Sequence, residues 1–234
     1  ICIHLSDVAY HIAPDSPLDR EALRRGTSIC LGNTVIPILP ENVRQACALV
    51  QGQERLALSL LIVVDATGEV AGFEIQPSTI EVDYQLTYSQ AEAALDFHHQ
   101  KEGATPSELS ASVLENLDRL CQLGQAIRDQ RIQRGSFELA LPESHRFFEI
   151  EEPSGVVVRL SNAIVQCMVR ELSILCNQCI GEHLQALGIP AIHCVHPVPD
   201  LEDVQDAIKL ASNMGVDLWL EDEETLYPTD FKQF

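Results

Sequence analysis

Two cysteines and two histidines in the second half of the chain have the spacing of a metal site. Cys176-x-x-Cys179 is followed by His193-x-x-His196, and thiolate and imidazole ligands in such pairs suit tetrahedral zinc. The elements expected around them argue against zinc, because the cysteines fall inside a long helical pattern rather than on a hairpin. The histidines fall on a strand-like stretch, where a three-residue step points them to opposite faces. Buried thiols and strand-end histidines are the favoured interpretation, and zinc stays the alternative.

Other chemical patterns are less specific. Eight cysteines and eight histidines would allow a cysteine nucleophile with a histidine partner, but no local signature selects a pair. The acidic run at residues 221–224 could bind a cation, although a block of like charge more often forms a solvated surface. The chain has no GxxxxGK[ST], GxGxxG or GxSxG pattern, so neither a phosphate-binding loop nor a serine-hydrolase elbow is predicted.

Helices account for the clearest periodic segments. Thr105, Pro106 and Glu108 form a helix start, and apolar residues then recur at three- and four-residue steps until Gly135. A second helix is expected over residues 162–187, with apolar residues around most of its circumference, and is predicted to be central and buried. A last helix begins after Asp200 and runs to about residue 213. A short polar helix is expected over residues 19–25.

Strands are expected between these helices. Residues 55–64 and 69–75 predict a β-hairpin that turns at residues 65–68. Further β segments are expected at residues 1–11, 84–88, 137–141 and 146–160. With no repeat or linker to divide them, these elements predict one α+β (mixed α/β) domain over residues 1–234. Its hairpins and sheets would pack around the long central helix.

The composition fits a globular protein with a sizeable core. Apolar residues make up 46% of the 234 residues, and the formal net charge is −20, with only three lysines. This negative charge argues against binding of a nucleic-acid phosphate backbone by this surface alone. No apolar run approaches a membrane span, and the cysteines lie mostly in apolar patterns, which favours a reducing, cytoplasmic location. Because Ile1 already lies in an alternating apolar stretch, the chain is expected to be an interior fragment.

A series of ordered motifs resembles the ribonuclease II / ribonuclease R family of exoribonucleases and its RNB catalytic domain. Residues 5–14 are similar to the family's H-I-A-D-V-S-x-Y-V-x-P segment, and the match continues through residues 17–22, 25–28 and 35–41. Further matches follow in the family's order at residues 55–59, 86–88, 134–135 and 196–200. The resemblance covers nearly the whole chain and is densest before Tyr88.

The resemblance implies hydrolysis of single-stranded RNA, one nucleotide at a time, from the 3′ end. Nucleoside monophosphates would be released with the help of Mg²⁺ held by clustered aspartates, a ligand set that suits a hard cation. In the family these aspartates belong to a D-x-D-D-A-like motif upstream of the segment that begins here. The arginine that contacts phosphate belongs to a T-S-P-I-R-R-Y-like motif expected after Phe234. We therefore expect no catalytic residue and no metal ligand within this chain, and no turnover by it alone.

Three residues match family positions at or near the RNA channel. The resemblance implies that Asp7 adjoins the site, that Tyr88 contacts RNA, and that Glu171 lies on the helix that lines the channel. Each also has a purely structural interpretation. Asp7 could cap a turn, Tyr88 could pack in the core, and Glu171 could pair with Arg170 or with a neighbouring arginine.

Three departures weaken the match where RNA would be held. Cys30 and Leu139 stand where the family has a Tyr and a Phe that stack on the terminal bases, and such stacking is worth about 1–3 kcal/mol per base. Asp83 stands in a run where the family tends to have a lysine. Two hypotheses follow: a piece of an active exoribonuclease, or a catalytically inactive RNB homologue that acts as an RNA-binding or protein-interaction module.

Overall fold

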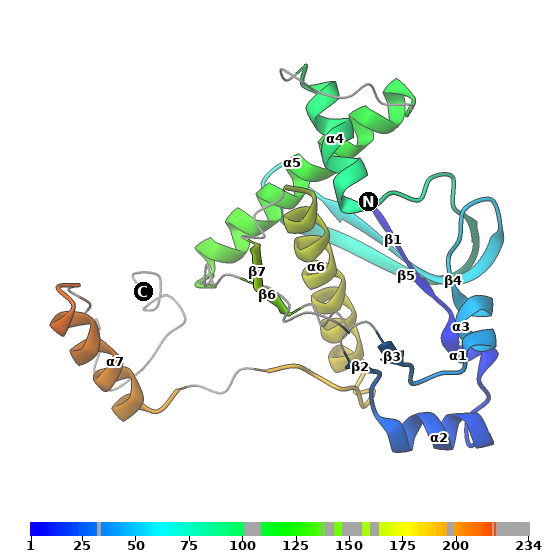
Figure 1. Cartoon of the computed structure of the whole chain (residues 1–234), viewed down its shortest axis with the longest axis horizontal. Coiled ribbons are helices and arrows are strands. Elements are labelled where there is room, and N and C mark those ends of the chain that lie inside the picture. Colours follow the sequence, from blue (N-terminus) through cyan, green and yellow to red (C-terminus); the bar gives the residue numbers. More distant parts are fainter. Residues whose placement is uncertain are drawn as a thin grey trace. The chain divides into compact units, whose positions relative to one another are not determined.

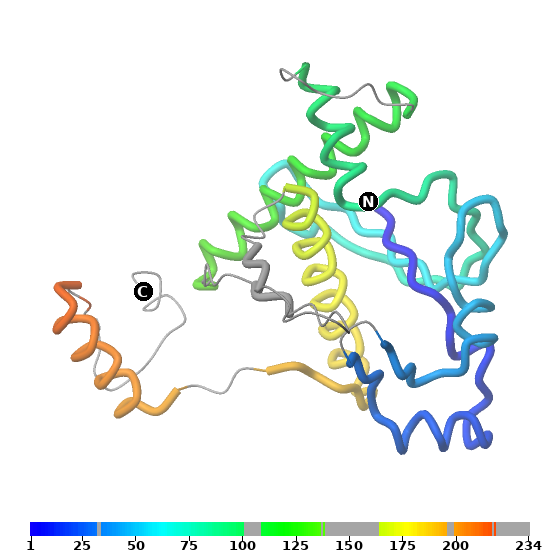
Figure 2. Tube along the Cα trace, viewed as in Figure 1, coloured from blue at the N-terminus to red at the C-terminus, as the bar shows by residue number. Residues whose placement is uncertain are grey.

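The computed structural model describes residues 1–31, 34–100, 109–136, 138, 143–146, 156–159, 164–195, 199–216 and 218. The remaining residues are drawn as a thin grey trace in Figure 1, and Figure 2 follows the path of the chain from blue at the N-terminus to red at the C-terminus. The chain forms two compact units that alternate along the sequence. The first contains residues 1–64, 70–114 and 141–166, and the second contains residues 65–69, 115–140 and 167–234.

A three-stranded antiparallel sheet forms the centre of the first unit. It contains β1 (Cys2–Ser6), β4 (Glu54–Val64) and β5 (Val70–Glu81), in the order β1-β4-β5. Figure 1 shows β4 and β5 as a long hairpin with β1 beside it. The register pairs Leu5 with Leu58 and Leu58 with Pro77. As an edge strand of this sheet, β5 accommodates a proline that a central strand would exclude.

The central strand β4 is buried on both of its faces. Ala57 and Ser59 lie on one face, and Leu60 and Ile62 lie on the other. Ser59 is a buried polar residue that is satisfied by neighbouring strands. His4 Nδ1 lies 2.6 Å from Ser59 Oγ, and Ser59 Oγ is hydrogen-bonded to Ser78 Oγ. The buried hydroxyl therefore joins all three strands without an unpaired polar atom.

Short helices and two smaller hairpins complete the first unit. Ser16 caps α2 by accepting a hydrogen bond from the Asp19 amide, and Pro17 occupies the first turn, where no amide donor is needed. The elements are α1 (Val8–His11), α2 (Pro17–Arg25), β2 (Ile29–Leu31), β3 (Thr34–Ile36), α3 (Glu41–Cys47), α4 (Tyr88–His98), β6 (Glu143–Arg146) and β7 (Val156–Arg159). β2 pairs with β3, and β6 pairs with β7, both antiparallel.

Helices dominate the described part of the second unit. It holds most of α5 (Ala111–Gln133) and α6 (Ile164–Ala186), together with α7 (Leu201–Asn213). The two long helices approach closely at Gly124, where an added Cβ would lie 3.0 Å from Met168 Cα. Cys121 Sγ lies 3.7 Å from Met168 Sδ beside this contact. A glycine therefore lets the two backbones approach this closely.

The tip of the β4–β5 hairpin, residues 65–69, belongs to the second unit. Asp65 Oδ1 accepts hydrogen bonds from the amides of Thr67 and Glu69, at 2.8 and 3.0 Å. Gly68 has a positive φ of 90°, and a Cβ there would lie 2.7 Å from the backbone of Ala126 in α5. The tip thus combines an Asx turn with a close backbone approach that only glycine permits.

The structure confirms the α+β class and corrects several predicted elements. The strand expected over residues 1–11 ends at Ser6, because Asp7 caps the one-turn helix α1. Residues 84–87 form no strand, and Tyr88 begins α4. The long helix begins at Ala111 rather than at Pro106, since Leu109 and Ser110 are not helical. The expected cap at Thr105 lies outside the described residues.

The helix α6 is buried along one stripe and not around its whole circumference. Val165, Met168, Glu171, Leu175 and Cys179 are buried at three- and four-residue steps, whereas Ile164, Val169 and Ile174 are exposed. The helix was predicted to be central and buried, and its burial is confined to this stripe although apolar residues occur around most of its circumference. Among the helices that the structure describes, none is long and apolar enough to cross a membrane.

Candidate functional site

Asp7 lies where β1 gives way to α1. Its backbone amide extends the pairing of β1 with β4 by donating a hydrogen bond to Leu56 O at 3.2 Å. Its side-chain Oδ1 accepts a hydrogen bond from the Tyr10 amide at 3.1 Å. Asp7 also acts on Cys47, whose thiol pKa is raised mainly by burial and secondarily by the negative charge of Asp7. The half-buried carboxylate therefore has a capping role.

Tyr88 is the first residue of α4. The preceding Thr87 and Gln90 form a capping box, in which the Thr87 hydroxyl accepts from the Gln90 amide and the Gln90 side chain accepts from the Thr87 amide. This cap is the sequence signal that identifies the unpredicted helix. With 46% of its surface exposed, Tyr88 does not pack in the core. Its aromatic ring is accessible for stacking.

Cys30 and Asp83 are both described, whereas Leu139 lies outside the described residues. Cys30 is exposed on β2 and pairs in register with Val35 of β3. Every residue of these two short strands is exposed. A thiol at this position presents much less flat surface to a base than a tyrosine ring would.

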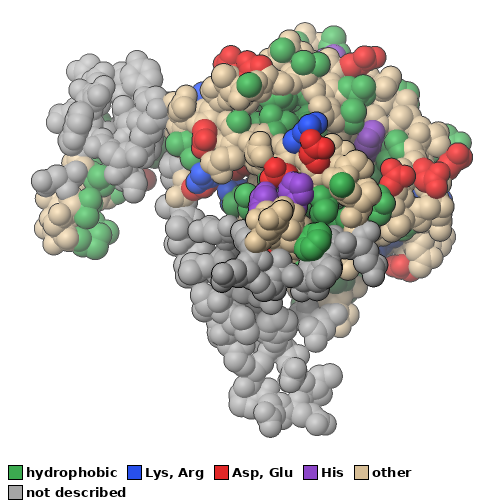
Figure 3. All heavy atoms as spheres, turned by 90° about the horizontal axis from the view of Figure 1, so that it is seen from above, with side chains coloured by type: hydrophobic (Ala, Val, Ile, Leu, Met, Phe, Trp, Pro, Cys, Tyr) green, Lys and Arg blue, Asp and Glu red, His purple; other side chains and the backbone are tan. Residues whose placement is uncertain are grey.

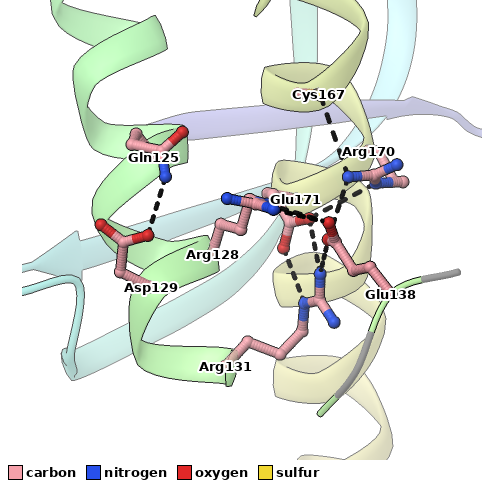
Figure 4. A network of polar contacts seen from close by, with 8 residues as sticks. All are labelled: Gln125, Arg128, Asp129, Arg131, Glu138, Cys167, Arg170 and Glu171. Atoms are coloured by element: carbon pink, nitrogen blue, oxygen red, sulfur yellow. Dashed lines mark hydrogen bonds and ion pairs between the residues drawn. The ribbon is translucent and has the colours of Figure 1, made fainter. Parts of the chain in front are cut away.

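Glu171 is fully buried, at 1% exposure, on the inner stripe of α6. Arg131 of α5 binds it with both prongs of its guanidinium, from Nε to Oε2 at 2.8 Å and from Nη2 to Oε1 at 2.9 Å. Arg170 contributes a weaker contact from Nε at 3.4 Å. Figure 4 shows this pairing between the two helices. The arrangement is a buried, bidentate ion pair that joins α5 to α6.

Glu138 joins the same group of arginines. Its carboxylate receives Arg128 Nη2 at 2.7 Å, Arg170 Nη2 at 3.1 Å, and a short hydrogen bond from Arg131 Nη2. Hydrogen bonds from Arg128 are the main reason that the pKa of Glu138 lies below its usual value. In the same way, the bonds to Glu171 raise the pKa of Arg131. We call these five residues, Arg128, Arg131, Arg170, Glu138 and Glu171, the arginine cluster.

The structure does not bring Asp7, Tyr88 and Glu171 together into one site. Asp7 and Tyr88 belong to the first unit, and Glu171 belongs to the second. Glu171 is brought together with Arg131, a partner that the sequence did not single out. Glu138 was missed altogether. The three-residue step from Arg128 to Arg131, which places both on one helix face, was the available signal.

The zinc alternative gains no support from the geometry. Cys176 and Cys179 are buried within α6, as the helical pattern predicts, and burial raises the pKa of both thiols. His196 lies outside the described residues. Among the residues whose placement is described, no group of three or more His, Cys, Asp or Glu could hold a metal ion.

Comparisons with known proteins agree on one family. The RNB domain model matches residues 1–232. The acetazolamide conferring resistance protein zam of Synechocystis sp. is 34% identical over 229 residues, which cover 98% of this chain and 29% of that protein. Ribonuclease R of Thermotoga maritima is 29% identical over 219 residues, 92% of this chain and 30% of that protein. The chain thus spans about 30% of the length of these relatives.

Solved structures share the fold. The apo form of Mycoplasma genitalium RNase R matches with a TM-score of 0.89 at 23% identity, over 99% of this chain and 35% of that one. Its complex with ribose methylated single-stranded RNA has a TM-score of 0.87 at 22% identity, over 99% and 35% of the two chains. Yeast Ssd1, described as a pseudonuclease, has a TM-score of 0.65 at 16% identity, over 94% and 26%. With the family model matching almost every residue, the chain belongs to the RNB domain family.

Proposed function

We propose that the protein containing this chain is a hydrolytic exoribonuclease that shortens single-stranded RNA from its 3′ end and releases nucleoside monophosphates. The observation that carries the proposal is the RNB match over residues 1–232, together with relatives named Ribonuclease R. We propose further that these residues are part of one RNB domain. The activity belongs to the whole protein, of which this chain supplies part of the RNA path.

The metal required for this chemistry is proposed to be Mg²⁺, bound by aspartates outside the present sequence. Within the described ranges, the carboxylates, imidazoles and thiols form no group suited to a metal ion. The ion would activate water and neutralise the phosphate undergoing cleavage. In this proposal the described residues bind and orient RNA.

Tyr88 is proposed to contact RNA directly, supported by its exposed ring at the start of a capped helix. Base–aromatic stacking tolerates any base, as a non-selective exonuclease requires. Asp7 and Glu171 are proposed as further residues of the RNA channel. Because Asp7 caps α1 and Glu171 is bound by Arg131, both would act by holding the local backbone that faces the RNA.

The strongly acidic surface implies that other parts of the protein supply the positive charge. On the face drawn in Figure 3, acidic side chains are spread over the described surface, and Lys and Arg side chains are sparse. The formal charge is −20, and RNA affinity depends on cations that displace counterions. A cytoplasmic location is also proposed, supported by eight free cysteines, four of them buried.

The test uses the full-length protein and a single-stranded RNA labelled at its 5′ end. With Mg²⁺ present, we expect progressive shortening of the labelled strand and release of nucleoside monophosphates. Excess EDTA should stop both, and DNA of the same sequence is the matched control. Internal cleavage, or shortening that begins at the labelled end, would contradict the proposal.

A second candidate function is a catalytically inactive RNB homologue that binds RNA or protein. The exposed Cys30 on β2 favours it, because the family's tyrosine there would stack on a terminal base. In the same assay this alternative predicts that RNA is bound but stays full length in Mg²⁺ and in Mn²⁺. Changing Cys30→Tyr should then tighten RNA binding without producing cleavage.

A further inference from the structure

Three arginines of the arginine cluster converge on one carboxylate, which is unusual in a chain with 15 basic and 35 acidic residues. Glu138 Oε2 receives Arg128 through Nε at 3.1 Å and Nη2 at 2.7 Å. Glu138 Oε1 receives Nη2 of both Arg131 and Arg170. Four N–H donors therefore fill the acceptor capacity of this one side chain. Figure 4 shows the guanidinium groups turned toward it.

The two carboxylates of the cluster differ in how they are held. Glu171 is buried and accepts hydrogen bonds from both Nε and Nη2 of Arg131. It is therefore a fixed part of the contact between α5 and α6. Glu138 keeps 27% of its side chain exposed, and its partners Arg128 and Arg170 keep 31% and 46%. Solvent, and therefore another anion, can reach the second carboxylate but not the first.

The arginine cluster carries more positive than negative charge, so it could bind an anion of higher charge than a carboxylate. Three arginines face two carboxylates, and if Glu138 withdrew, Arg128 and Arg170 would lose their principal counter-charge while Arg131 stayed paired with Glu171. A phosphate group presents several oxygens to guanidinium forks and forms bidentate, charge-assisted hydrogen bonds with them. A single carboxylate satisfies the same donors with less negative charge than a phosphate monoester.

We propose that Arg128, Arg131 and Arg170 form a phosphate-binding site that the Glu138 carboxylate occupies when no ligand is bound. An incoming phosphate displaces Glu138 and takes over its hydrogen bonds. This inference deepens the proposed function, and it rests on that function only for RNA as the source of the phosphate. A free nucleotide or inorganic phosphate has the same binding chemistry.

The alternative is that the contacts of Glu138 with the arginines only stabilise the fold and form no binding site. In that case Glu138 ties its segment to α5 and α6, and its removal leaves repelling arginines that do not gain affinity for phosphate. A self-occupied site predicts the reverse, because removing the internal competitor opens the site. The response of a Glu138 variant to phosphate therefore separates the two interpretations.

The first experiment compares Glu138→Gln with Glu115→Gln in the full-length protein. Both changes remove one negative charge, and Glu115 pairs with the exposed Arg119 on the same helix. Thermal unfolding is measured in inorganic phosphate and in chloride at equal ionic strength. We expect phosphate to raise the Tm of Glu138→Gln by more than it raises that of wild type or Glu115→Gln. An equal response of the two variants overturns the proposal.

The second experiment identifies the source of the phosphate, using single-stranded RNA and a nucleoside monophosphate as separate probes in EDTA. If the source is RNA, Glu138→Gln should lower the Kd for RNA about two- to fivefold relative to Glu115→Gln, the range of one partly exposed ion pair. If only the monophosphate binds more tightly, the site stands and its ligand is the free nucleotide.

Two controls keep the result interpretable. Adding Arg170→Gln to Glu138→Gln should abolish the gained phosphate response, because Arg170 is one of the two exposed donors. A double variant that keeps the full response would contradict the assignment. If wild-type protein does not degrade RNA but Glu138→Gln still responds to phosphate, the proposed activity fails while the phosphate site remains.

Discussion

The sheet of the first unit and the helix pair of the second are stabilised by different means. In the sheet, Leu60 and Ile62 are buried on β4, and the buried polar Ser59 is satisfied by adjacent strands. In the helix pair, the backbones meet at Gly124, and the buried Glu171 depends on an arginine 40 residues away in sequence. The sheet therefore combines apolar burial with regular strand pairing, and the helix pair combines its apolar stripe with one specific buried charged contact.

The largest expected effect breaks the helix pair. Glu171→Ala leaves Arg131 without its buried counter-charge, and we expect a loss of about 3–5 kcal/mol in the free energy of unfolding. Urea unfolding measures it. Glu182→Ala, on the same helix but at an exposed position that accepts a hydrogen bond from Gln178 one turn away, should change stability by less than about 0.5 kcal/mol. Similar losses of unfolding free energy in both variants would show that the buried Arg131–Glu171 pair contributes no more than an exposed hydrogen bond.

The matching change in the sheet is Leu60→Ala. Leu60 is 1% exposed, so the truncation leaves a cavity and should lower the free energy of unfolding by about 2–5 kcal/mol. Leu58→Ala on the same strand removes a side chain that is 37% exposed, and it should have a clearly smaller effect. If the two truncations cost the same, burial is not what distinguishes the two positions.

The hairpin tip offers a test with a matched glycine. Gly68→Ala would place a Cβ 2.7 Å from the Ala126 backbone at a positive φ, whereas Gly52→Ala has the same kind of φ and nothing within 4 Å. We expect Gly52→Ala to lower the free energy of unfolding by about 1 kcal/mol and Gly68→Ala by about 1–3 kcal/mol more. Equal effects would leave backbone strain as the whole explanation.

Acid should weaken the helix pair through Glu138. The pKa of Glu138 is lowered by its arginine partners, so its stabilising contribution is complete above the ordinary glutamate pKa of about 4.3 and is lost as the pH falls through the lowered value. The effect should stay below about 1 kcal/mol, as for partly exposed pairs. Urea midpoints between neutral and acid pH should fall less steeply for Glu138→Gln than for Glu115→Gln.

The smallest effect is a difference in rates rather than in stability. Burial raises the pKa of the Cys121 thiol to about 11, so almost none of it is thiolate near pH 8. Cys2 and Cys30 are exposed and should react with a thiol reagent at once. Mass spectrometry of the labelled peptides should show Cys121, on α5, reacting only as that helix opens.

The hairpin and the helices could be predicted because their signals are local. The apolar run in residues 56–64 gives β4, and the turn at residues 65–68 joins it to β5. Ser16 with Pro17 is the local start signal of α2, which begins two residues before the expected helix. The missed helix α4 also has a local signal, the capping box of Thr87 and Gln90, but the β-forming residues around it were given more weight.

The arginine cluster could be predicted only in part, because its partners are distant in sequence. Pairing of Glu171 with an arginine was only the structural alternative to its role in the RNA channel, and nothing in the local pattern selects Arg131 or brings Glu138 to both helices. The RNA roles of Asp7, Tyr88 and Glu171 stay predictions from family resemblance. Charge and spacing restrict the possible partners, and only the tertiary fold chooses between them.

The alternation of the two units along the chain has a practical consequence for dissecting this protein. The boundary at residues 114 and 115 falls inside α5, and the boundary at residues 166 and 167 falls inside α6. A protease that seeks exposed, irregular backbone finds no linker at either place. Neither unit can therefore be excised as one continuous peptide, and studies of one unit must be made in the presence of the other.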